Sequence, residues 1–87
     1  MSITRTTVAD KLLAYLRHQL TLSELVAWSE AAIMDGDLTE GDEPLLMEVL
    51  TKLGVADVRA FGLTWEDCEQ MMRQFGYTLR IEASHAA

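Results

Sequence analysis

The residues best suited to chemistry are the acids of one short segment between two predicted helices. Carboxylates alternate with small residues in the segment Asp35-Gly36-Asp37-Leu38-Thr39-Glu40-Gly41-Asp42-Glu43. A calcium-binding loop of this kind needs oxygen ligands at positions 1, 3 and 5, glycine at position 6 and glutamate at position 12. With Gly36 at position 6, positions 1 and 3 fall on Ala31 and Ile33, whose side chains have no oxygen. We interpret the segment as a solvated loop and expect no metal site.

Cys68 is the one cysteine of the chain, so neither an internal disulfide nor a thiolate-rich zinc site is expected. It lies on an apolar helical stripe between Asp67 and Glu69, whose charges raise the pKa of a thiol. Neither His18 nor His85 is placed in the sequence to act as its base. The sequence contains no phosphate-binding loop and no nucleophile motif. It also indicates no apolar pocket that would move the pKa values of two carboxylates apart, as acid–base catalysis by such a pair requires. We expect no enzyme and no cofactor.

Residues 55–75 have the spacing of a helix-turn-helix, with Gly62 in the turn. Three acids and one arginine would then face the phosphates of DNA, which is unfavourable. We favour a packed helical hairpin and expect no nucleic-acid binding. The polar residues of the candidate recognition helix are Glu66, Asp67, Glu69, Gln70, Arg73 and Gln74.

Capping residues and helical periodicity predict two helices in the first half of the chain. The first runs over about 7–19, where Thr7 and Asp10 have the spacing of a capping box. The second begins at Thr21 with Glu24 as its capping partner, and it ends at Gly36 in a left-handed conformation. Its buried stripe is expected to be Leu22, Leu25, Val26, Ser29, Ala32 and Ile33.

Two more main helices are predicted in the second half. The third begins near Asp42 and is capped by Gly54, and the fourth begins at Thr64 and ends at Gly76. A short helix over 56–60 is expected between them. The apolar side chains expected inside are Leu45, Leu46, Val49, Leu50, Leu53, Val58, Phe61, Trp65, Cys68, Met71, Met72 and Phe75.

The apolar period changes from 3.6 to 2 after the fourth helix. Tyr77, Leu79 and Ile81 alternate with polar residues, which predicts a single C-terminal strand. A lone strand leaves half of its backbone groups unpaired. We therefore expect it to pair either with residues 2–4 or with the same strand of a second copy, in a homodimer centred on Leu79 or Ile81.

The net charge of −7 is concentrated in one part of the chain. Residues 24–48 carry eight acids and no basic residue, whereas residues 1–23 have a net charge of +2. Such a segment repels phosphates and suits a basic protein partner. The predicted partner-binding residues are Glu30, Asp35, Asp37, Glu40, Asp42 and Glu43. Trp28, Met34 and Met47 do not fit the main buried stripes, so we expect them to form either an apolar contact beside these acids or a second layer of the core.

The length of 87 residues corresponds to one domain over 1–87, with an ordered core over about 7–82. No apolar run approaches the length of a membrane-spanning helix, and the N-terminus does not have the pattern of a signal peptide. We expect a cytoplasmic protein that does not bind membranes.

Two parts of the chain resemble known families. Residues 22–28 and 61–68 resemble an uncharacterised family of short bacterial helical proteins with no assigned activity. About a third of the chain resembles the helix–Asp-Gly–helix junction of tellurite-resistance-type helical domains, through Asp35, Gly36, Leu38, Thr39 and an acid at Asp42 or Glu43. Neither resemblance implies an activity, a cofactor or a site residue.

Together these patterns predict an all-α bundle of four main helices plus one short helix, with a single C-terminal β-strand. The predicted function is a non-catalytic protein-interaction module, in its most concrete form an inhibitor or immunity-type protein, because small acidic helical proteins neutralise basic toxins. The alternatives are a helix-turn-helix regulator or adaptor, and a small accessory subunit of a larger complex.

Overall fold

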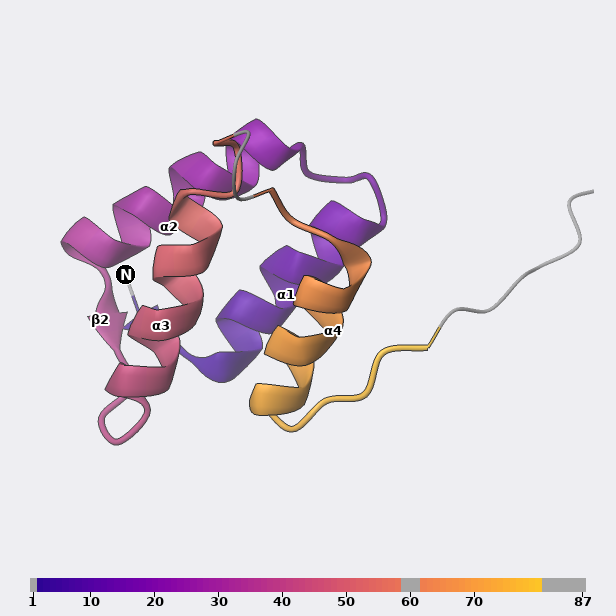
Figure 1. The fold of residues 1–87 in the computed structure, drawn as a ribbon. Coiled ribbons are helices and arrows are strands. Elements are labelled where there is room, and N and C mark those ends of the chain that lie inside the picture. The colour runs from indigo at the N-terminus through magenta and orange to yellow at the C-terminus, as the bar shows by residue number, and fades with distance from the viewer. Residues whose placement is uncertain (1, 59–61, 81–87) are drawn as a thin grey trace, which may run out of the picture.

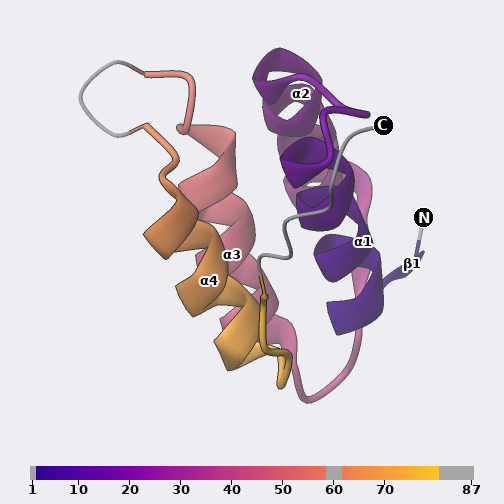
Figure 2. The ribbon, with the colours of Figure 1, turned by 90° about the vertical axis from the view of Figure 1, so that its right-hand side faces the viewer.

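The computed structural model describes residues 2–58 and 62–80, which fold mainly into helices, as predicted. Figure 1 shows how the helices are arranged, and Figure 2 shows α3 and α4 on one side of the molecule with α1 and α2 on the other. The elements in this part are β1 (Ser2–Ile3), α1 (Arg5–Leu16), α2 (Leu22–Asp35), β2 (Asp37–Leu38), α3 (Glu43–Gly54) and α4 (Trp65–Gln74).

The N-cap of helix α1 is Thr4, three residues before the predicted cap. The Thr4 hydroxyl accepts a hydrogen bond from the Thr7 backbone N–H, and the Thr4 N–H donates to the Thr7 hydroxyl, both at 3.1 Å. The predicted cap by Thr7 and Asp10 is therefore wrong, because Thr7 is the partner inside the first turn rather than the cap itself. The helix ends at Leu16, two residues before His18, which has a left-handed φ of 61°.

The predicted starts of α2 and α4 are confirmed. Thr21 forms a reciprocal capping box with Glu24, and Thr64 forms one with Asp67. The pKa of Glu24 is lowered, first by the hydrogen bond from the Thr21 N–H and then by that with the Thr21 hydroxyl. This stabilisation is present above the unfolded-state pKa of the carboxyl and is lost as the pH falls through the lowered folded-state pKa.

Gly36 has a different role from the one predicted. Its φ of −80° and ψ of 145° are extended, so the expected left-handed cap is wrong. A Cβ at this position would lie 2.5 Å from the Ala32 backbone oxygen and 2.8 Å from Cγ1 of Ile3. Gly36 is thus required by close packing, because the buried Ile3 side chain fills the space where a side chain at 36 would lie.

Two short strands that the sequence did not predict bring the start of the chain to its middle. β1 pairs in parallel with β2, with Ser2 opposite Asp37 and Ile3 opposite Leu38. The Ile3 carbonyl also accepts hydrogen bonds from the Thr39 N–H and the Thr39 hydroxyl, each at 3.0 Å. Ser2 and Ile3 therefore pair with the α2–α3 connection, and residues 77–80, the described part of the predicted C-terminal strand, form no strand beside them.

The core lies between α1 and α2 on one side and α3 and α4 on the other. The most extensive contact between two helices is that of α2 with α3. Most predicted core residues are buried, but Ile33 is 36% exposed and Val58 is 46% exposed, while Phe61 lies outside the described residues. Ile33 lies against Gly54 of α3, which has no side chain to cover it. The buried residues of the main cluster are Ile3, Val8, Ala9, Leu12, Leu25, Ala32, Leu46, Val49, Leu50, Leu53, Cys68, Met71, Met72 and Phe75.

Two predicted elements are not confirmed. Residues 55–58 form turns, and 59–61 lie outside the described residues, so the short helix over 56–60 is not seen. Residues 77–80 form no strand, and Ile81 lies outside the described part. Gly54 is the last residue of α3 rather than a residue beyond it, whereas Gly76 has the left-handed φ, 92°, expected of a residue that ends a helix.

Substitution of two glycines by alanine should change stability in opposite directions. We expect Gly36→Ala to lower the free energy of unfolding by about 1–3 kcal/mol, because the new Cβ overlaps a backbone oxygen that cannot move freely. Gly54→Ala should raise it by up to about 0.5–1 kcal/mol, because alanine favours the helix and its Cβ meets its nearest neighbour at an ordinary contact distance. Urea denaturation of both variants measures the two effects. A Gly36→Ala variant as stable as the parent protein would contradict the packing role.

Candidate functional site at the acidic junction

The six predicted partner-binding acids lie at one structural junction, the connection between α2 and α3 with the last turns of α2. We call this surface the acidic junction, formed by Glu30, Asp35, Asp37, Glu40, Asp42 and Glu43. The chain leaves α2 at Asp35, passes through β2 and turns at residues 39–42, where the Asp42 N–H donates to the Thr39 carbonyl at 3.0 Å. In Figure 1 this segment is the magenta connection at the left, which descends from α2 and turns into α3.

Asp42 is distinguished from the other five acids by a paired contact with Arg5. The Arg5 Nε donates to Asp42 Oδ2 at 3.1 Å, and its Nη2 donates to Oδ1 at 2.9 Å. The pKa of the Arg5 guanidinium is raised, first by this hydrogen bonding and then by the charge of Asp42. Because its side chain is engaged by Arg5, Asp42 forms no side-chain cap at the start of α3. Sequence analysis missed this pair because no pattern relates residues so far apart in the chain.

The remaining acids of the junction are available for contact. Within residues 2–58 and 62–80, none of them has an ion pair, whereas Glu48 pairs with Lys52 and Glu69 with Arg73, each at 3.6 Å. Like charges that follow one another along one connection without counter-charges produce a negative potential that attracts cations and cationic surfaces. The five exposed acids are Glu30, Asp35, Asp37, Glu40 and Glu43.

The structure separates Trp28 from Met34 and Met47, the three residues predicted to form an apolar contact. Trp28 is half-buried against the core, and the Lys11 Nζ lies 5.5 Å from its ring centroid, so this side chain belongs to the α1 side of α2. Met34 is 81% exposed and Met47 is 39% exposed. Ile33, which the sequence placed in the buried stripe, is exposed beside Met34. We call Ile33, Met34 and Met47 the apolar patch.

Two of the three residues predicted to form a dimer strand, Tyr77 and Leu79, contact their own domain, and the third, Ile81, lies outside the described residues. The Tyr77 hydroxyl is 3.4 Å from that of Thr6, and Leu79 packs against the core cluster. Figure 1 shows this segment, in yellow, leaving the end of α4 at the lower right. Tyr77 and Leu79 thus contribute to the monomer, and the homodimer stays a prediction.

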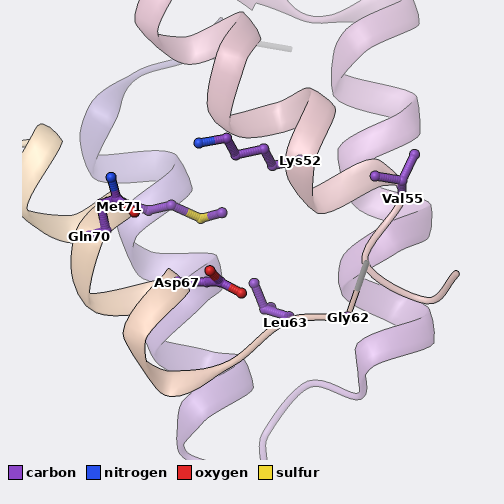
Figure 3. A pocket seen from close by; sticks show the side chains of 7 residues that line it. All are labelled: Lys52, Val55, Gly62, Leu63, Asp67, Gln70 and Met71. Atoms are coloured by element: carbon purple, nitrogen blue, oxygen red, sulfur yellow. The ribbon is translucent and has the colours of Figure 1, made fainter. Parts of the chain in front are cut away.

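A small pocket that the sequence did not indicate lies between α3 and α4 (Figure 3). Its volume is about 170 Å³, and it is lined by Lys52, Val55, Gly62, Leu63, Asp67, Gln70 and Met71. An apolar cavity of roughly this size holds one benzene-sized group. Its two charged side chains already have partners, since Lys52 pairs with Glu48 and Asp67 accepts a hydrogen bond from the Thr64 N–H. Neither of the two charged side chains among the described lining residues is therefore without a partner.

Within residues 2–58 and 62–80, the side chains considered for catalysis or metal binding form no cluster that could hold a metal ion, and His85 lies outside these residues. Cys68 is buried on α4, and burial, followed by the charge of Asp67, raises its pKa to about 11. In the described part of the chain, no three side chains among histidine, cysteine, aspartate and glutamate come close enough to hold a metal ion. The helices in that part also fall short of the length and apolar character that crossing a membrane demands.

The described residues form a mainly helical fold in which the end of α2, the α2–α3 connection and the start of α3 carry six acids. Comparison of the chain with protein-family models, curated proteins and solved structures found no match. The resemblances proposed for residues 22–28, 35–43 and 61–68 stay predictions.

The burial of Cys68 leads to a direct test of its reactivity. We expect the native protein to react very slowly with a disulfide reagent at neutral pH, because the thiol is inaccessible and its raised pKa keeps it protonated. Reaction should become fast in guanidinium chloride. A Cys68→Ser, Ser23→Cys variant, with the cysteine at an exposed position of α2, is the control that should react rapidly when folded. Rapid labelling of native Cys68 would contradict its role as a buried apolar residue.

Proposed function

We propose that this chain is a non-catalytic protein-interaction module that binds a basic protein partner through the acidic junction. An inhibitor or immunity-type protein is the most concrete form of the proposal. Five exposed acids on one surface, without counter-charges in the described part of the chain, are the observation that carries it. Such a surface accelerates association with a cationic partner and repels anionic ones.

The way the junction is held supports this proposal. The β1–β2 pairing and the two hydrogen bonds from Thr39 to Ile3 fix the backbone of residues 37–39. The Arg5–Asp42 pair fixes the start of α3. A backbone already ordered in the free protein loses little conformational entropy on binding, so more of the electrostatic attraction contributes to affinity.

The helix-turn-helix alternative has less support. It requires the short helix over 56–60, which the described residues do not contain. The exposed side of α4 carries Glu66, and Arg73 there is engaged by Glu69 at 3.6 Å. Phosphates would meet an acid and an arginine that already has a counter-charge. An accessory subunit of a larger complex would use the same acidic junction, so identifying the partner distinguishes that alternative.

Charge reversal in the acidic junction tests the proposed function. We expect the triple variant Asp37→Lys, Glu40→Lys, Glu43→Lys to lose the partner that the parent protein captures from a lysate of its native cells. With the identified partner, the variant's association rate should fall about tenfold or more at low salt, and less at high salt, because screening already weakens the parent's attraction. Asp42 is left unchanged because it stabilises the fold through Arg5.

The matched control is the triple variant Asp10→Lys, Asp57→Lys, Glu66→Lys, which reverses three exposed acids elsewhere. Each triple changes the net charge from −7 to −1, because every reversal adds two units. Circular dichroism of both variants verifies that the helices are retained. Equal loss of binding in the two triple variants would show an effect of total charge and contradict the assignment to the acidic junction. The assignment would also be contradicted if both triple variants captured the partner as well as the parent protein does.

A further inference from the structure

We infer that the partner segment recognised at the acidic junction is an amphipathic helix rich in lysine and arginine, whose apolar face covers the apolar patch. This inference rests on the proposed function and adds the chemistry of the partner. It follows from how the exposed apolar side chains and the unpaired acids are arranged relative to each other on α2 and α3.

Two residues of the apolar patch, Ile33 and Met47, lie on the flanks along which α2 and α3 face each other. A Cβ at Gly54 of α3 would lie 3.8 Å from Cδ1 of Ile33, so Ile33 is on the flank of α2 that faces α3. Met47 precedes Gly54 by seven residues, which is two helical turns, and it therefore shares the flank of α3 that faces α2. Met34 follows Ile33 and is the most exposed large apolar side chain of the described residues, at 81%.

Acids border this patch. Glu30 lies four residues before Met34, and Glu43 lies four residues before Met47, so each methionine has a carboxylate one helical turn away on its own helix. Asp35 directly follows Met34. An apolar patch bordered by acids matches a partner whose apolar side chains are flanked by cations. The acidic border repels an anionic membrane and a nucleic acid.

Other occupants fit less well. A second copy of the chain would bring its own acids, and its Arg5 and Lys11 are already engaged by Asp42 and Trp28. The sequence over 81–87 contains no lysine or arginine. An extended partner strand would need a sheet edge, but β2 is only two residues long.

A helix meets both requirements at once. It presents apolar side chains three to four residues apart on one face and long cationic side chains on its flanks. Methionine is also suited to this contact because its flexible thioether adapts to different apolar surfaces.

The probe for this inference is a synthetic helical peptide of roughly 15 residues made only of leucine and lysine, with leucine at helical spacing. A scrambled peptide of the same composition, with no apolar face, is its control. We expect the protein to bind the amphipathic peptide about tenfold more tightly than the scrambled one at physiological salt. Met34→Ser should weaken binding at least about fivefold, whereas Val58→Ser, which removes an exposed apolar side chain outside the patch, should not.

Methionine methyl groups provide a second readout. In protein labelled with ¹³C at the methionine methyls, the resonances of Met34 and Met47 should shift on titration with the amphipathic peptide. Those of the buried Met71 and Met72 should stay unchanged. Substitution of single methionines assigns the resonances, and the shifts locate the contact independently of affinity.

The possible failures of the inference and of the proposed function are distinguishable. Equal binding of both peptides, lost only in the junction triple variant, would show recognition by charge alone and overturn the helical partner while the proposed function stands. The same holds if neither peptide binds but a lysate partner is captured through the junction. If the junction triple variant changes binding of neither peptide nor partner, the proposed function fails and this inference fails with it.

Discussion

The burial of Ile3 beneath the α2–α3 connection is the contact on which the shape of the acidic junction depends. Complete removal of an isoleucine side chain from water contributes about 1.5–3 kcal/mol, and here Ile3 occupies the space that the absent side chain of Gly36 leaves open. Once Ile3 is in place, its carbonyl receives both hydrogen bonds from Thr39. Arg5 follows two residues later and reaches Asp42. One apolar anchor thus orients the contacts that hold the connection.

Two groups of acids have different roles in the structure. One group stabilises local structure through helix caps and ion pairs, and its members are Glu24, Asp42, Glu48, Asp67 and Glu69. The other group consists of the five junction acids besides Asp42, and these have no such partner within the described residues. Charge that the fold does not use costs stability through mutual repulsion. Its concentration on one fixed surface, beside exposed methionines, is why we assign the interaction to that surface.

Much of the helical framework could be predicted because its signals are local. The boxes at Thr21 and Thr64 and the apolar stripes of α3 and α4 depend on residues three to four positions apart. The positions of the junction acids also followed from their run in the sequence. The role of Gly36 could not be predicted, because it depends on Ile3, which is distant in the chain. The exposure of Ile33 has the same origin, since periodicity assigned it to the core but the neighbouring helix provides only Gly54 to cover it.

The parallel pairing of β1 with β2 also has a consequence for the order in which the molecule folds. Ile3 and Leu38 are paired across a loop that contains all of α1 and α2. Closing such a loop costs chain entropy that local helical contacts do not, so we expect this contact to form after the two helices it encloses. During synthesis Ser2 and Ile3 emerge well before their partners on β2. The surface on which recognition is proposed is therefore expected to acquire its fixed geometry late, through residues made long before their partners.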